Sequence, residues 1–163
     1  MGILKGYIKF NNALNKVVGY IMMVLLAIMT VLIFWQVFAR FITNNPSTFS
    51  EEASRFMMIW LALLGSAFAL RKRELVAVDV IYNALKGKKK RIITVIISVI
   101  SIFFYLIMII YGYKMANSIS FQTAPTTGIS MFWPMLAIPA GGLLLLLNAI
   151  AVSIEEFVNE EVD

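Results

Sequence analysis

Four long apolar stretches dominate the chain, and polar or charged segments separate them. The stretches without charge run over 17–39, 56–70, 92–113 and about 131–154. A helix of about 20 residues crosses the roughly 30 Å hydrocarbon core of a bilayer. Three of the stretches reach this length, and the second reaches it if its helix begins earlier, near residue 53. The pattern predicts an all-α integral membrane protein with four transmembrane helices over about 17–39, 53–70, 92–113 and 131–154.

Two shorter segments outside these spans are also apolar. In residues 1–16, apolar residues recur at helical spacing opposite lysines, which is typical of a short amphipathic helix in the membrane interface; a frayed basic tail is the alternative. Residues 75–85, LVAVDVIYNAL, are too apolar for a free linker and too short to span. They are expected to lie on the membrane or against a partner, within a basic loop over 71–91. The whole chain, 1–163, is therefore predicted to be a single membrane domain.

The entrance to the second predicted span, FSEEASRF at 49–56, concentrates charge. Ser50 is a plausible N-cap, and the next two glutamates would lie in the first turn, where the helix dipole favours negative charge. Glu51 is four residues before Arg55, a spacing that predicts an ion pair. Two interpretations of Glu51 and Glu52 stay open: they only stabilise the start of this helix, or they also contact a partner.

Small and hydroxylated residues suggest how the spans pack. Small residues at a spacing of three or four positions let membrane helices approach closely. They occur in the second and fourth predicted spans as Ala62, Gly65, Ser66, Ala69, Ala137 and Gly141. Ser98 and Ser101 in the third span could bond between helices, but hydroxyl bonds to carbonyls of their own helix are favoured.

Lysines and arginines lie almost entirely on one predicted side of the membrane. Of the 14, all but Arg40, Arg55 and Lys114 precede the first span or lie between the second and third. The positive-inside rule therefore predicts that both termini and the 71–91 loop are cytoplasmic. The pI near 9.6 reflects this topology and contact with anionic membrane lipids, and no feature indicates nucleic acid as a partner.

The composition limits the chemistry open to the chain. It is 61% hydrophobic with no cysteine and no histidine, so imidazole haem ligation, iron–sulfur clusters and thiolate or imidazole zinc sites are excluded. Every charge lies at a span end or in a loop, whereas ion and proton pathways use charges within spans. We expect no enzyme activity, no cofactor and no metal site, and no capacity to translocate a substrate alone.

The residues from 40 to 79 resemble the small membrane subunit, of the DctQ type, of tripartite ATP-independent periplasmic (TRAP) transporters. The matching features are Arg40 closing the first span, the Ser50-Glu51-Glu52 entry, Gly65, the basic exit at Arg71 to Arg73 and the valine-rich run ending in Asp79. The stretch TAPTTGISMFWPMLAIPAGG, residues 123–142, also resembles the family. Two positions depart from its pattern: Phe49 stands where a tryptophan is frequent, and Leu75 where a histidine is common.

The resemblance implies a division of labour. In such transporters a periplasmic substrate-binding protein captures an organic acid, and a large membrane subunit moves it with sodium by an elevator-like motion. The small subunit holds the large one in the bacterial inner membrane and needs no cofactor, since sodium coupling belongs to the large subunit. Sialic acid and C4-dicarboxylates are both open as substrates.

The implied partners are the large subunit, the binding protein and membrane lipids. The residues proposed for subunit contact or binding-protein docking are Arg40, Glu51, Glu52, Arg55, Arg71 and Asp79. A different class stays open as the alternative: a self-assembling structural membrane protein, or an accessory subunit of another membrane complex.

Overall fold

The computed structural model describes residues 2–42, 47–74 and 88–160, and its regular structure there is helical. The helices are α1 Gly2–Ile42, α2 Thr48–Lys72, α4 Lys88–Ser118, α5 Phe132–Met135 and α6 Ala137–Glu160. Four segments of the described part are long and apolar enough to cross a membrane: Gly6–Ile42, Thr48–Lys72, Val95–Ser118 and Phe132–Glu155. The predicted fold class, all-α with four transmembrane helices, is confirmed.

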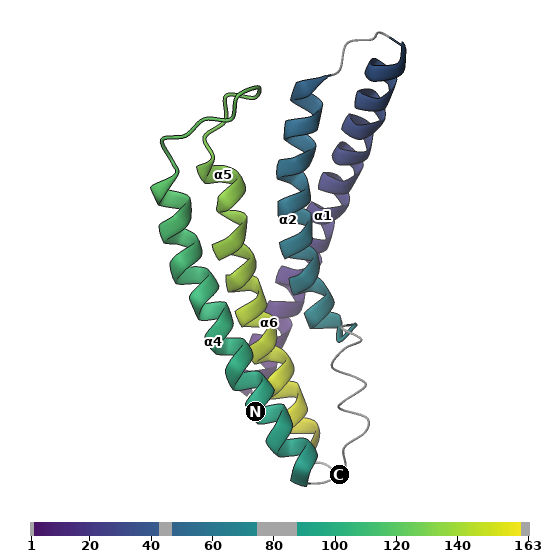
Figure 1. Ribbon diagram of the computed structural model, residues 1–163. Helices are drawn as coiled ribbons and strands as arrows, with labels where there is room; N and C mark the ends of the chain where they lie inside the picture. Colours follow the sequence, from purple (N-terminus) through teal and green to yellow (C-terminus); the bar gives the residue numbers. More distant parts are fainter. Residues whose placement is uncertain (1, 43–46, 75–87, 161–163) are drawn as a thin grey trace.

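The helices form two pairs that join through α6 (Figure 1). Helix α1 packs beside α2, and α4 packs beside α6, which also contacts α2 and the N-terminal part of α1. The first residues of α1 and α4 and the last residues of α2 and α6 lie at one end of the bundle, which we call the terminal end (Figure 1). The connection 119–131 and α5 lie at the opposite end, which we call the loop end, beside the start of α2.

Helix α1 is longer than expected. The sequence pattern predicted an interfacial helix over 1–16 and a separate span over 17–39, but one helix of 41 residues runs from Gly2 to Ile42. No proline interrupts this segment, and its N-terminal part packs against α6 instead of turning away. At about 1.5 Å per residue the helix is about 60 Å long, roughly twice the hydrocarbon thickness. Residues 2–16 therefore extend the first span as part of the bundle.

The start of α2 differs from the prediction in its cap. The N-cap is Ser47, whose Oγ accepts a hydrogen bond from the Ser50 N–H at 3.4 Å, so the predicted cap at Ser50 is wrong. Ser50 lies one turn inside the helix and is buried. A serine at either position can cap a helix, and starting at Thr48 adds a turn before the apolar stretch. The predicted pairing of Glu51 with Arg55 is present, at 2.8 Å between exposed side chains.

The fourth span is divided near Pro139. Helix α5 ends at Met135 and α6 begins at Ala137, because Pro139 has no N–H to donate to the carbonyl one turn earlier. The N–H of Leu136 donates to the Phe132 carbonyl at 2.8 Å, so the chain keeps a helical course through the break.

Adjacent glycines let α6 lie between α2 and α4. A Cβ at Gly141 would lie 2.8 Å from the Leu63 Cβ of α2, and one at Gly142 would lie 3.1 Å from the Met108 Cβ of α4. Both distances are closer than side-chain atoms tolerate without movement, so these backbones approach because the side chains are absent. The Ser98 hydroxyl meets the Ser153 hydroxyl at 3.2 Å across α4 and α6, so the expectation that it bonds only within its own helix is wrong.

The other small residues predicted for packing are distributed unevenly. Ala137 of α6 is fully buried, whereas Ala62 and Ser66 of α2 are exposed. The Ser66 hydroxyl donates to the Ala62 carbonyl of its own helix at 2.7 Å. Gly65 and Ala69 are half-buried, and a Cβ at Gly65 would make only ordinary contact with a methionine methyl at 3.5 Å. The close approach between α2 and α6 therefore depends on Gly141 more than on the small residues of α2.

Candidate functional site

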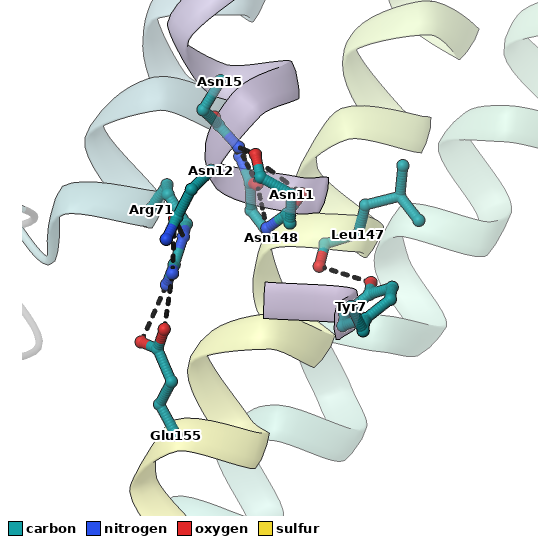
Figure 2. A network of polar contacts seen from close by, with 8 residues as sticks. All are labelled: Tyr7, Asn11, Asn12, Asn15, Arg71, Leu147, Asn148 and Glu155. Atoms are coloured by element: carbon teal, nitrogen blue, oxygen red, sulfur yellow. Dashed lines mark hydrogen bonds and ion pairs between the residues drawn. The ribbon is translucent and has the colours of Figure 1, made fainter. Parts of the chain in front are cut away.

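A buried cluster of amides joins three helices near the terminal end. Asn11 and Asn15 of α1 and Asn148 of α6 are only 1%, 5% and 0% exposed. Asn11 and Asn15 lie one helical turn apart, so both side chains face α6 (Figure 2). We call these three residues the asparagine cluster.

All the hydrogen-bonding capacity of the Asn148 amide is used. Its Oδ1 accepts from Asn11 Nδ2 at 2.9 Å and from Asn15 Nδ2 at 2.6 Å. Its Nδ2 donates to Asn15 Oδ1 at 2.9 Å and to the Ala67 carbonyl of α2 at 2.7 Å. Two donors and two acceptor positions are the full complement of an amide side chain. One residue thus bonds α6 to both α1 and α2.

An ion pair continues this polar region toward the end of the bundle. Arg71 of α2 binds Glu155 of α6 in a bidentate arrangement, with Nη1 donating to Oε2 at 2.8 Å and Nη2 donating to Oε1 (Figure 2). Arg71 Nε and Nη2 also donate to Asn12 Oδ1 of α1 at 2.9 and 2.7 Å. The Arg71 side chain is only 10% exposed, which reduces solvent screening of the pair relative to a surface pair.

Tyr7 adds a further contact between α1 and α6 in the same region. Its hydroxyl donates to the Leu147 carbonyl at 3.0 Å, beside the asparagine cluster (Figure 2). Tyr7, Asn11 and Asn15 follow one another at intervals of four residues, so they form one polar face of α1. This face explains why the N-terminal part of α1 stays on the bundle.

At the loop end, Glu52 of α2 binds the connection between α4 and α5. Its Oε2 accepts hydrogen bonds from the backbone N–H groups of Thr126 and Thr127 at 3.0 and 2.7 Å. A carboxylate that accepts two backbone N–H bonds makes charge-assisted hydrogen bonds, which are stronger than neutral ones. Glu52 therefore fixes a loop that is more than 70 residues away in sequence.

The shape of that loop presents its N–H groups to Glu52. The Gly128 N–H donates to the Ala124 carbonyl at 3.0 Å, and Gly128 has a φ of +67°, in the left-handed region that glycine adopts without strain. A second contact at this end joins α2 to α5, because Trp60 Nε1 donates to the Trp133 carbonyl at 3.3 Å. The loop is thus held both by its own turn and by α2.

The sequence-predicted interface residues lie at both ends of the bundle. Arg40 is exposed near the end of α1, at the loop end that also carries the exposed Glu51–Arg55 pair and Glu52. Arg71 lies at the terminal end, bound within the chain. Asp79 lies outside the described residues. The structure therefore places Arg71 away from the other described candidates.

The asparagine cluster was missed in the sequence, although two signals pointed to it. Asn148 is a polar residue inside an otherwise apolar span, where an unpaired amide is costly. Asn11 and Asn15 have the spacing of one helix face. Neither signal identifies the partner, because the contact joins residues more than 130 positions apart.

The described residues contain no group of three or more histidine, cysteine, aspartate or glutamate side chains able to hold a metal ion. The polar groups at both ends of the bundle are paired mainly with one another and with backbone atoms. Their arrangement is suited to fixing helices in place.

Comparison with known proteins places most of the chain in one family. The family model for tripartite ATP-independent periplasmic transporters, DctQ component, matches residues 29–159. The chain is 27% identical over 136 residues to the sialic acid TRAP transporter small permease protein SiaQ of Vibrio cholerae, a match that covers 83% of this chain and 76% of that protein. It is 29% identical over 132 residues to a putative TRAP transporter small permease protein of Haemophilus influenzae, covering 80% of this chain and 79% of that one.

A longer relative is also similar. The chain is 26% identical over 142 residues to the sialic acid TRAP transporter permease protein SiaT of Haemophilus influenzae. This match covers 87% of the chain but only 23% of SiaT. A segment similar to this chain therefore occurs within a larger permease polypeptide.

The asparagine cluster generates a stability prediction. Asn148→Leu, a change to a side chain of similar size, should lower the free energy of unfolding by about 2 kcal/mol, because four hydrogen bonds between helices are lost. Reversible unfolding of the purified chain in mixed detergent micelles measures this change. Asn117→Leu is the matched control, since Asn117 is exposed at the end of α4. Equal stability of the two variants would contradict the importance of the cluster.

A second prediction concerns the loop that Glu52 holds. Glu52→Ala should make the amide hydrogens of Thr126 and Thr127 exchange about tenfold faster, because two charge-assisted hydrogen bonds are removed. Glu52→Gln should have an intermediate effect, since its amide oxygen still accepts hydrogen bonds without the charge. Hydrogen–deuterium exchange with mass spectrometry resolves the loop. Glu51→Ala should leave the loop unchanged, and the same acceleration in that control would argue against a specific role for Glu52.

Proposed function

The chain belongs to the DctQ family of TRAP transporter subunits, and from this we propose that it serves as a rigid frame for the large permease subunit. It is a multi-pass membrane protein and a transporter subunit, not an enzyme. Membership in the family implies association with a large permease subunit. The proposal concerns what the small subunit contributes to that association.

The observation that carries the proposal is the fixation of the helices at both ends. Near the terminal end, the asparagine cluster and the Arg71–Glu155 pair join α1, α2 and α6. At the loop end, Glu52 binds the connection before α5. A protein that changes shape to move a substrate needs helices that can adopt two arrangements. In this chain the buried polar groups form hydrogen bonds that stabilise one arrangement of the helices.

The lateral surface of the bundle is suited to an apolar partner or to lipid. Large apolar side chains are exposed along α1 and α4; Phe34 is 73% exposed and Phe103 is 66% exposed. Between the two ends, the sequence of the spans has no aspartate, glutamate, lysine, arginine or histidine, the residues that most often couple a substrate to an ion gradient. Such a surface supports side-by-side packing of helices in the membrane. We therefore assign translocation and sodium coupling to the large subunit.

The similarity to SiaT supports a complex between this chain and a large permease subunit. In that protein a region similar to this chain occupies 23% of a single permease polypeptide. Parts that occur together in one polypeptide in one organism are candidates for a stable complex when they are separate chains.

An organic acid is the proposed substrate class of the complete transporter, and sialic acid is the first compound to test, since two relatives are named for it. A C4-dicarboxylate is the second. We assign the substrate contacts to the large subunit and a periplasmic binding protein. The exposed Glu51–Arg55 pair and the loop held by Glu52 form a polar rim that is proposed to help dock that binding protein or to meet the large subunit.

The proposed orientation in a bacterial inner membrane puts the terminal end, which holds most of the lysines and arginines, in the cytoplasm. The chain has no native cysteine, so single cysteines report their side directly. In whole cells, a membrane-impermeant thiol reagent should label Thr126→Cys and leave Lys9→Cys unlabelled until the cells are lysed. Labelling of Lys9→Cys in intact cells would show that the orientation is the reverse of the one proposed.

Omitting the small subunit tests its proposed role. Liposomes that contain both membrane subunits, with a sialic acid-loaded binding protein outside and an inward sodium gradient, should take up sialic acid. Leaving out this chain should lower the initial rate at least tenfold, because the large subunit loses its frame, and this chain alone should transport nothing. Radiolabelled uptake measures all three conditions, and liposomes without protein are the control.

Two results of the uptake assay and one of purification would contradict this function. Sodium-driven uptake by the small subunit alone would show that it translocates, and full activity of the large subunit alone would show that no frame is required. If the purified chain forms homo-oligomers and recovers no large subunit from detergent-solubilised membranes, a self-assembling structural protein is the better description.

A further inference from the structure

A basic pocket opens between α1, α2 and α6 beside the Arg71–Glu155 pair. Its volume is about 530 Å³. Its lining residues are Asn12, Asn15, Lys16, Phe68, Arg71, Lys72, Arg73 and Glu155. Four cationic side chains and a single carboxylate therefore surround one opening.

Among the described side chains that line the pocket, positive charge exceeds negative charge. Glu155 accepts two hydrogen bonds from Arg71, so these two side chains neutralise one another. Lys16, Lys72 and Arg73 line the same opening and are exposed. Three cations close together repel one another unless an anion lies among them. The pocket therefore favours a ligand with negative charge.

The pocket lies where the apolar parts of three helices end. Lys16 immediately precedes the apolar stretch of α1, Arg71 immediately follows that of α2, and Glu155 immediately follows that of α6. Because all three line one pocket, these boundaries lie at the same depth. In a membrane protein, the depth at which apolar side chains give way to charged ones is the depth of the lipid headgroups.

The wall of the pocket combines an aromatic face with the charges. Phe68 lies one turn before Arg71 and Lys72 on α2, and the Lys72 Nζ lies 4.8 Å from the centre of its ring. An apolar side chain beside cations suits a ligand that has a charged headgroup and an apolar tail. A small inorganic anion would use only the charged part of this wall.

We propose that this pocket binds the phosphate group of an anionic phospholipid. Lys16, Lys72 and Arg73 contact the phosphate, and Phe68 contacts the start of the acyl chains. Arg71 stays bound to Glu155 and Asn12, so it contributes positive potential and fixes the pocket wall. In this arrangement the phosphate bridges α1, through Lys16, and the C-terminal end of α2, through Lys72 and Arg73.

Native mass spectrometry of the full chain in detergent tests this site. Phosphatidylglycerol should bind at lipid concentrations where phosphatidylcholine does not bind, because only phosphatidylglycerol carries a net negative charge. Removing one lysine should weaken phosphatidylglycerol binding about fivefold, and the double variant Lys16→Gln/Lys72→Gln about 25-fold. Inorganic phosphate added in excess should leave the lipid bound, since it lacks the apolar part.

A matched variant controls for the loss of charge. Lys9→Gln/Lys114→Gln also removes two lysines, and Lys114 lies over the Tyr111 ring much as Lys72 lies over Phe68, but neither residue lines the pocket. This control should bind phosphatidylglycerol as the unmodified chain does. Thermal unfolding of both double variants checks folding, and Arg73→Gln replaces the Lys16/Lys72 variant if that variant is unfolded.

Three results would overturn the proposal. These are equal lipid binding by the two double variants, equal retention of phosphatidylglycerol and phosphatidylcholine, and displacement of the lipid by inorganic phosphate, which would make the ligand a soluble phosphate. The measurement needs no transport activity, so its failure would leave the proposed function of the chain intact.

Discussion

The structure depends most on the need to satisfy a buried amide in apolar surroundings. Asn148 can place its side chain inside a span only if donors and acceptors reach it from other helices, since an unpaired amide there costs several kcal/mol. Asn11, Asn15 and the Ala67 carbonyl supply all of them. This requirement selects one rotation and one depth for α1 and α2 against α6. Apolar packing alone distinguishes these arrangements poorly, because lipid and helix surfaces are equally apolar.

The two ends of the bundle then support one another through α6. The glycines that let α2 and α4 approach α6 lie near its start, while Asn148 lies two turns further on. Glu52, near the start of α2 at the loop end, binds the connection that leads into α5 and α6. Helix α2 is thus joined to the α4–α6 half at both of its ends. This double attachment is the physical basis for the proposed role as a frame.

Local patterns could be predicted from the sequence, and contacts between distant segments could not. Hydropathy identified the four spans because helix length and bilayer thickness are linked, and the Glu51–Arg55 pair followed from i, i+4 spacing. The cap at Ser47 was not predicted because a serine at 47 and a serine at 50 give equivalent capping patterns. The continuity of α1 was not predicted because an amphipathic N-terminal segment has the same local pattern whether it is a separate helix or the start of a longer one. The asparagine cluster and the partners of Glu52 depend on tertiary placement. Asn11 and Asn15 also precede the residues matched by the family model, so the resemblance gave no indication of them.

The contacts within the chain also narrow where a partner can bind. Arg71 was a candidate for subunit contact, but its guanidinium is bound to Glu155 and Asn12 and is largely buried. Moving it to a partner would break the bidentate pair and leave Glu155 without its cation, a loss that a new exposed pair would not recover. Glu52 is similarly committed to its loop. Among the described residues, the exposed apolar faces of α1 and α4 and the exposed charges of Arg40, Glu51 and Arg55 at the loop end stay open to a partner. Assembly would then combine broad apolar packing, which is tolerant of position, with a few charges at the loop end that define the register between subunits.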